Sequence, residues 1–216
     1  MKKVYSLLFI VILFMLGGCD DKKNQNSTIV TENTTQILQT DKNESFSKKN
    51  ISFNGNVTQI VTHAFALSDL QQKSYKGTLN DKAIFLEGVN APAVIFHFFA
   101  TWCPPCAGEA PYLSDLQKKH PQELFIAGIT VNDTPTQEIL EKFIQENHAD
   151  YYISTAREND ALATEITEVL NLDSNFSLPL TVIYHNGKYL SHYEGAVPVE
   201  ILEHDIHEAI KDSKQE

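Results

Sequence analysis

A Cys-x-x-Cys pair between a buried strand and a helix restricts the possible folds of this chain more than any other feature. Residues 93–100 are almost continuously apolar, which is typical of a central strand buried on both faces. Cys103 and Cys106 follow closely, and Pro104 stands where the first turn of a helix tolerates a missing N–H group. We therefore expect a helix over residues 104–119, with the cysteines at its N-terminus.

The position at a helix N-terminus suits the cysteine pair to disulfide exchange. Disulfide exchange needs a thiolate, and the N–H groups and dipole at a helix N-terminus stabilise that anion. We expect Cys103 to be the nucleophile and Cys106 to resolve the mixed disulfide. The alternatives are a zinc site and an inert structural disulfide. Zinc is disfavoured because the sequence offers no second Cys or His pair at metal-like spacing, and the strand-to-helix context disfavours an inert disulfide.

The remaining elements follow from hydrophobic periodicity and turn signals. Thr134 is expected as the N-cap of a helix that starts at Pro135, and Asn186-Gly187 is the strongest hairpin signal in the chain. The polar segment 68–77 is expected as a hairpin or turn, with an extension at residues 83–86. Further strands are predicted at residues 61–67, 124–131, 151–154, 180–184 and 188–193. The helix that starts at Pro135 is expected to end at residue 146, and further helices are predicted at residues 159–170 and from 198 onward.

This order of elements predicts an α/β fold with a mixed central sheet, helices on both faces and an N-terminal β extension. It is similar to the order in thioredoxin, and we expect a thioredoxin-like domain over residues 60–216. Residues 19–59 are rich in Asn, Ser, Thr and Lys, so we expect a flexible tether there. Asn43 and the segment 173–177 lie in sequences that resemble an acid-extended glycosylation signal of some bacteria; a plain linker and an ordinary loop are the alternatives.

The N-terminus has the three zones of a secretory signal. Two lysines precede an apolar stretch over residues 4–16, which is shorter than the roughly 20 residues of a spanning helix, and two glycines lead to Cys19. A retained anchor is one alternative. Residues 16–19 resemble the bacterial lipobox, which implies a lipoprotein signal peptide over residues 1–18 and a lipid on Cys19; a free Cys beside an ordinary cleavage site is the other alternative. Asp20 resembles the residue that retains some lipoproteins in the inner membrane, so we expect a periplasmic protein anchored there by lipid.

Residues 98–106, which read Phe-Phe-Ala-Thr-Trp-Cys-Pro-Pro-Cys, resemble the active-site segment of the TlpA/ResA/CcmG group of periplasmic thioredoxin-like proteins. Glu109 and Pro111 continue the resemblance, which covers roughly the last three-quarters of the chain. It implies a redox-active cysteine pair that needs no cofactor, with Trp102 packed beside it. The residues of this segment that it assigns to the site are Trp102, Cys103, Pro104, Pro105 and Cys106.

Leu178-Pro179 precedes a predicted strand, at the place where the thioredoxin fold carries a cis-proline that faces the cysteines. The resemblance assigns that role to Pro179. A cis X-Pro bond costs only about 0.5–1 kcal/mol relative to trans, so a tertiary fold can impose it. An ordinary trans proline at the start of a strand is the alternative.

Two ionisable residues near the cysteines each have two interpretations. Glu109 is either a buried carboxyl that moves protons to or from Cys106, with a pKa raised by burial, or a helix-face glutamate stabilised by the helix dipole. His97 occupies a strand position where thioredoxins often carry a buried acid and the TlpA-like group often carries Asn. It is either a proton shuttle or a core histidine whose hydrogen bonds are satisfied.

The net charge of the chain and the family resemblance together reduce the number of functions that we consider. The net charge of -11 and the lack of a basic stripe argue against a nucleic-acid partner. The resemblance implies a reductase of disulfides in exported proteins, such as apocytochrome c or its maturation factors, recharged by a membrane electron donor of the DsbD/CcdA type. The alternatives are a disulfide oxidase or isomerase, a peroxidase and a non-catalytic binding module. We expect no metal; His204 and His207, on the last predicted helix, are interpreted as part of a solvated face.

Overall fold

The computed structural model describes residues 62–212 of the chain. The predicted signal peptide, the predicted tether, Cys19, Asp20 and Asn43 all lie outside these residues. No helix among the described residues is long and apolar enough to cross a membrane.

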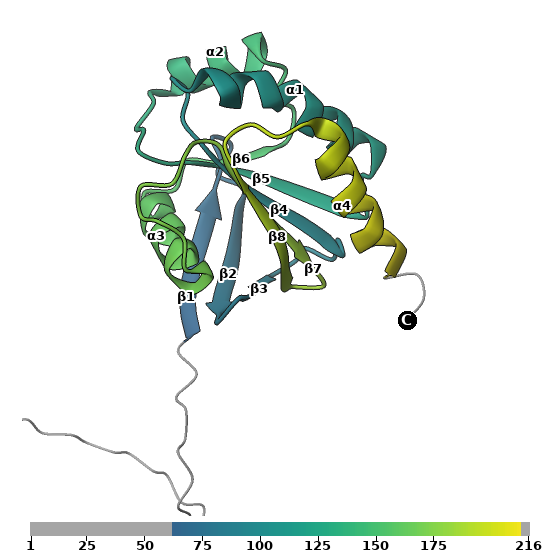
Figure 1. Ribbon diagram of the computed structural model, residues 1–216. Coiled ribbons are helices and arrows are strands. Elements are labelled where there is room, and N and C mark those ends of the chain that lie inside the picture. The colour runs from purple at the N-terminus through teal and green to yellow at the C-terminus, as the bar shows by residue number, and fades with distance from the viewer. Residues whose placement is uncertain (1–61, 213–216) are drawn as a thin grey trace, which may run out of the picture. The chain divides into compact units, whose positions relative to one another are not determined.

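The described residues form one eight-stranded mixed sheet with four helices (Figure 1). The spatial order of the strands is β1-β2-β3-β8-β7-β4-β5-β6. β4 pairs with β5 and β5 with β6 in parallel, whereas the other neighbours are antiparallel. The strands are β1 (Thr62–Ser68), β2 (Ser74–Asn80), β3 (Ala83–Leu86), β4 (Ala93–Phe99), β5 (Leu124–Thr130), β6 (Tyr152–Ser154), β7 (Leu180–His185) and β8 (Lys188–Glu194). The helices are α1 (Pro104–Lys119), α2 (Gln137–Glu146), α3 (Asn159–Leu170) and α4 (Val199–Asp212).

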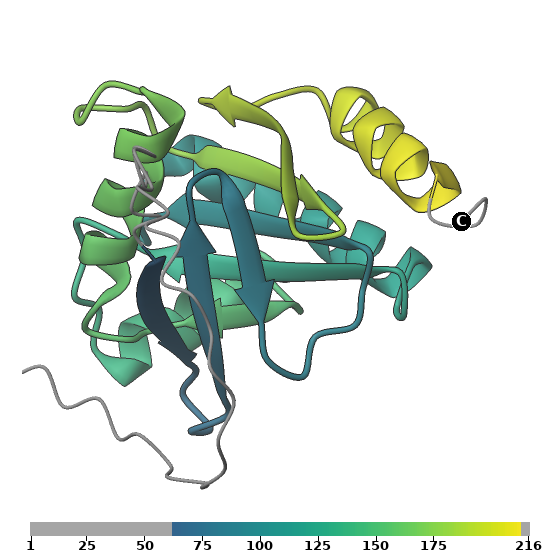
Figure 2. The ribbon, with the colours of Figure 1, turned by 90° about the horizontal axis from the view of Figure 1, so that it is seen from below.

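The central strand β4 divides the interior into two cores. All seven of its residues are buried, because its side chains alternate between two covered faces. Ala93, Ile95 and Phe99 pack under α1, α2 and α4. Val94, Phe96 and Phe98 on the opposite face pack against α3 and the β1–β3 meander. In the view from below, this meander lies in front of the central strands and α1 lies behind them (Figure 2). The predicted mixed sheet, the helices on both faces and the N-terminal β extension are therefore confirmed.

The hairpin predicted at Asn186-Gly187 is also confirmed. Both residues have positive φ values, 49° and 75°, which suit the tight turn between β7 and β8. The tip of the hairpin contacts β3, where the Ile84 N–H group donates to the Gly187 carbonyl at 2.7 Å. A Cβ atom on Gly187 would lie 2.5 Å from the Ile84 carbonyl oxygen, so this contact requires a glycine.

The turn predicted within residues 68–77 is present, because residues 69–73 connect β1 and β2 in an antiparallel hairpin. The extent of β2 was not predicted, since this strand carries polar side chains on its exposed positions and buries little besides Leu79. One local prediction is wrong. The second helix begins at Gln137 rather than at Pro135, and its N-cap is Thr136 rather than Thr134. Thr136 is extended, and its hydroxyl oxygen accepts from the Ile139 N–H group at 3.3 Å. Both threonines are good N-caps by residue type, so only the packing of the helix decides between them.

Candidate active site

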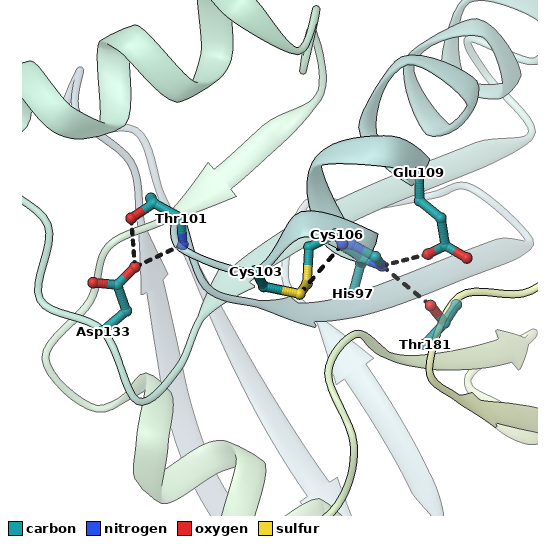
Figure 3. The surroundings of a disulfide bond; sticks show 7 residues. All are labelled: His97, Thr101, Cys103, Cys106, Glu109, Asp133 and Thr181. Atoms are coloured by element: carbon teal, nitrogen blue, oxygen red, sulfur yellow. Dashed lines mark hydrogen bonds and ion pairs between the residues drawn. A yellow bond between two sulfur atoms is a disulfide. The ribbon is translucent and has the colours of Figure 1, made fainter.

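The two predicted redox cysteines form a disulfide at the start of α1 (Figure 3). Cys103 is the N-cap of the helix, with extended backbone, and its Sγ accepts a hydrogen bond from the Cys106 N–H group at 3.3 Å. The two residues differ in exposure, because Cys103 keeps 4% of its surface accessible and Cys106 keeps none. An incoming thiol can therefore approach the disulfide only from the side of Cys103.

The residues around the disulfide form an exposed apolar rim. Pro104 and Pro105 are exposed, and Trp102 has 63% of its surface accessible. The resemblance implied that Trp102 packs beside the cysteines. Trp102 neighbours Cys103 along the chain, most of its surface faces solvent, and its packing beside the cysteines stays a prediction.

A hydrogen-bonded clamp that the sequence analysis missed holds the segment between β4 and Cys103. The backbone N–H group and the hydroxyl of Thr101 both donate to Asp133 Oδ2, each at 2.7 Å (Figure 3). Thr101 follows β4 and Asp133 follows β5, and these strands are parallel neighbours. Polar residues just after two such strands lie at the same edge of a sheet, and this is the signal that could have revealed the pair.

The peptide bond between Leu178 and Pro179 is cis, as the sequence analysis expected. Pro179 is buried and stands directly before β7, whose first residue, Leu180, pairs with Phe98 near the end of β4. The cis bond therefore lies at the same end of the sheet as the cysteines. The Pro179 carbonyl accepts from the Gly195 N–H group at 2.8 Å, which ties this loop to the end of β8.

Glu109 lies one helical turn after Cys106 and is buried beneath α1. Its Oε1 accepts a hydrogen bond from the Val197 N–H group at 2.6 Å, while its Oε2 has no hydrogen-bond partner among the described residues. Burial raises the pKa of this carboxyl, and the hydrogen bond from Val197 partly opposes that shift. Glu109 is therefore buried, as its first interpretation expects, and its role in proton transfer stays a prediction.

His97 lies in the middle of β4, between Thr181 of β7 and Gly128 of β5. Its ring is fully buried, with Nδ1 at 3.1 Å from Thr181 Oγ1 and 3.8 Å from Glu109 Oε2. Burial lowers the pKa of His97 to about 3, so the imidazole is neutral at neutral pH. The alternative of a core histidine with satisfied hydrogen bonds is only half correct, because Nε2 has no partner among the described residues.

Tyr151, just ahead of β6, is a further buried polar residue of this face that the sequence analysis did not single out. Its hydroxyl has no hydrogen-bond partner in the described part of the chain, and burial, together with the charge of Glu109, raises its pKa. The ring lies over Gly128, where a Cβ atom would be 2.9 Å from Tyr151 Cε2. A glycine inside an apolar strand is a sequence signal for such a close approach.

No group of three or more His, Cys, Asp or Glu residues within 62–212 is arranged to hold a metal ion. His204 and His207 are both exposed on α4. The described part of the site consists of a disulfide at a helix N-terminus, a buried carboxyl one turn along that helix and a buried neutral imidazole beside the carboxyl.

Comparisons with known proteins agree with this arrangement. The chain is 26% identical over 139 residues to "Thiol-disulfide oxidoreductase ResA" of Oceanobacillus iheyensis, a match that covers 64% of this chain and 68% of the relative. It is 34% identical over 55 residues to "Sporulation thiol-disulfide oxidoreductase A" of Bacillus subtilis, which covers 24% of this chain and 33% of that protein.

Among solved structures, a thioredoxin-family thiol:disulfide interchange protein of Chlorobium tepidum has a TM-score of 0.51 at 19% identity, over 68% of this chain and 93% of that one. This similarity shows that the fold is thioredoxin-like. The family model described as Redoxin matches residues 68–188, which is more than half of the sequence. The chain therefore belongs to the Redoxin family.

Proposed function

We propose that this chain is an extracytoplasmic thiol–disulfide oxidoreductase, tethered by a lipid on Cys19, that reduces disulfides in exported proteins through Cys103 and Cys106. The observation that carries the proposal is the cysteine pair at the N-terminus of α1, with one sulfur at the surface side and the other buried one helical turn before the buried carboxyl of Glu109. The names of the matched relatives support the general class of thiol–disulfide oxidoreductase.

The reaction begins with the dithiol form. The Cys103 thiolate attacks one sulfur of a substrate disulfide, a mixed disulfide forms, and the other substrate sulfur leaves as a thiolate. Cys106 then attacks Cys103 Sγ and releases the second substrate thiol. The two electrons of the dithiol pass to the substrate, and the protein ends in the disulfide form that the structure contains.

The helix terminus and Glu109 have separate roles in this proposal. The N–H group of Cys106 already donates to Cys103 Sγ, and the same bond would stabilise a Cys103 thiolate. Cys106 is buried, so its thiol needs a nearby base before it can attack. We assign the uptake of that proton to Glu109, which lies one turn further along α1 and has a pKa raised by burial.

We propose that substrates bind to the apolar rim around Cys103. Trp102, Pro104 and Pro105 offer exposed apolar surface, and the loop with the cis Leu178–Pro179 bond lies at the same end of the sheet. A surface of this kind recognises an extended or unfolded segment around a disulfide better than a compact one. This agrees with exported proteins as clients, and apocytochrome c or its maturation factors are the clients that we propose.

The proposed location rests on the N-terminal sequence. The lipobox-like residues 16–19 and the following Asp20 favour a lipid anchor in the inner membrane, facing the periplasm. An anchor of this kind raises the effective concentration of the domain near membrane partners. The dithiol would be regenerated by a membrane electron donor of the DsbD/CcdA type.

The reduction potential of the cysteine pair tests the direction of electron flow. The full-length chain with Cys19→Ser would be equilibrated in dithiothreitol or glutathione buffers, with the fluorescence of its single tryptophan as the readout. A potential below about -200 mV supports a reductase, whereas a value near about -120 mV makes the protein an oxidant and refutes the proposed direction. The matched variants Cys106→Ser and Cys103→Ser test the mechanism, because only the first should trap a mixed disulfide with a substrate.

A further inference from the structure

The face of the sheet beneath α1 buries three polar side-chain atoms that have no hydrogen-bond partner among the described residues. They are His97 Nε2, Glu109 Oε2 and the Tyr151 hydroxyl. Buried polar atoms are nearly always paired, because an unpaired one loses its hydration without compensation. The helix that covers this face begins at the redox cysteines. We therefore relate these three unpaired atoms to disulfide exchange.

Contacts with neighbouring residues fix the positions of the His97 ring and the Glu109 carboxyl. Thr181 lies opposite His97 in the β4–β7 register, and its Oγ1 is 3.1 Å from Nδ1. The ring also stacks on Phe99, with the ring centres 5.9 Å apart. Glu109 is held at its other oxygen by the Val197 N–H group. Nδ1 and Oε2 consequently face each other at 3.8 Å, slightly beyond hydrogen-bond distance (Figure 3).

The surroundings of the ring favour one of its two neutral forms. With its proton on Nδ1, His97 donates to Thr181 Oγ1 and leaves only an acceptor lone pair unpaired at Nε2. With its proton on Nε2, it would bury an N–H donor without an acceptor, which proteins tolerate less often. The Nδ1–H group therefore points toward the space between Thr181 and Glu109.

We propose that His97 is a positioning residue for disulfide exchange, whose Nδ1–H group is shared between Thr181 and Glu109 and moves to Glu109 Oε2 whenever that carboxyl is ionised. This inference rests on the proposed function. In the resolving step the Glu109 carboxylate takes the proton of the Cys106 thiol, and the new Cys106 thiolate attacks Cys103 Sγ. The bond from Cys103 to the substrate sulfur breaks, and the substrate leaves as a thiolate.

The observed distances fit the state after this step. In the proposed cycle Glu109 carries the proton taken from Cys106 once the disulfide has formed and then requires no donor at Oε2; in the structure Nδ1 is closer to Thr181 than to Oε2. Two other titratable groups neighbour Glu109. They are Cys106, on the same helix, and Tyr151, whose pKa is raised. At neutral pH Tyr151 keeps its proton, and His97, 3.8 Å away, is the neighbouring side chain to which we assign the control of Glu109 ionisation.

Two substitutions should shift the pH at which Glu109 ionises in opposite directions. His97→Phe keeps a ring to stack on Phe99 but removes the N–H donor, so Glu109 should ionise at a pH higher by about one unit, the size expected for one hydrogen bond to a carboxylate. Thr181→Val removes the competing acceptor with little change in shape and should move the ionisation of Glu109 to lower pH. His97→Asn places an amide nitrogen close to the position of Nδ1 and should restore most of the wild-type behaviour.

The experiment uses the full-length chain with Cys19→Ser in every sample. The ionisation of Glu109 is followed by carboxyl-carbon NMR of ¹³C-labelled glutamate in the disulfide form, with Glu109→Gln to assign the signal. The rate of reduction of a disulfide-bonded peptide by the dithiol form is measured from pH 5 to 9. Shifts of opposite sign in His97→Phe and Thr181→Val, present in both measurements, support the proposal.

Failure of this inference is distinguishable from failure of the proposed function. Coincident titration curves and pH–rate profiles in the wild type, His97→Phe and Thr181→Val overturn the role of His97, even if the wild type exchanges disulfides well. Equal rates in the wild type and Cys103→Ser overturn the proposed function, while the NMR titration still reports on the contact. If His97→Phe does not fold, the test rests on Thr181→Val alone. Glu109 should then ionise at a lower pH in Thr181→Val than in the wild type, and the absence of this shift refutes the proposal.

Discussion

Replacing His97 by Asn should make the protein markedly more resistant to acid. His97 is fully buried in β4, and burial lowers its pKa from 6.5 to about 3. The unfolded chain therefore binds a proton on this residue at a pH where the folded protein does not. The stability that the neutral ring contributes is complete above pH 6.5 and is lost progressively as the pH falls toward 3.

The magnitude follows from the width of that window. Each pH unit below 6.5 removes about 1.4 kcal/mol, so the loss is about 3 kcal/mol at pH 4.5 and approaches about 5 kcal/mol near pH 3. This is a large part of the roughly 5–15 kcal/mol that holds an ordinary domain folded. Glu109 acts in the opposite direction, because its raised pKa makes the folded protein gain stability as the carboxyl is protonated.

Urea unfolding of the oxidised protein at pH 7.0, 5.5 and 4.5 measures the effect. Glu109 is present in both proteins, so the difference between wild type and His97→Asn isolates the histidine. Relative to wild type, the free energy of unfolding of His97→Asn should rise by about 3 kcal/mol between pH 7.0 and 4.5. The matched control is His204→Asn, which replaces a histidine on the exposed face of α4 and leaves the buried position in β4 unchanged. Parallel stability curves for wild type and His97→Asn would refute the reasoning.

Three further substitutions test the packing around the site, each by urea unfolding at neutral pH. Gly128→Ala places a Cβ atom 2.9 Å from Tyr151 Cε2 and should destabilise the protein by about 1–3 kcal/mol; an unchanged midpoint would mean that the ring moves freely. Asp133→Ala removes the acceptor of both 2.7 Å bonds from Thr101 and should cost about 1–3 kcal/mol and slow disulfide exchange, whereas unchanged values would show that the clamp is dispensable. Thr136→Ala removes the N-cap of α2 and should cost about 1 kcal/mol, while Thr134→Ala, its matched control, should cost less.

The elements around the site could be predicted because their signals are local. The apolar run that became β4, the proline at the start of α1 and the Asn-Gly turn between β7 and β8 each describe a few adjacent residues. The prediction was incomplete or wrong where local signals were weak or duplicated. β2 is a polar strand that depends on pairing with β1 and β3, and two threonines beside Pro135 were equally suitable as N-caps.

The sequence by itself determined the chemistry that is available to this protein. It placed Cys103 and Cys106 at the start of a helix, Glu109 one turn later and a proline before a strand, because spacing along a helix or strand decides which neighbours lie together. Only the tertiary structure decided which distant groups meet. Thr101 contacts Asp133, and Nδ1 of His97 lies between Thr181 and Glu109, through strand order and register that no local pattern specifies. The same packing excludes water from this face, and this desolvation shifts the pKa values of Glu109 and His97.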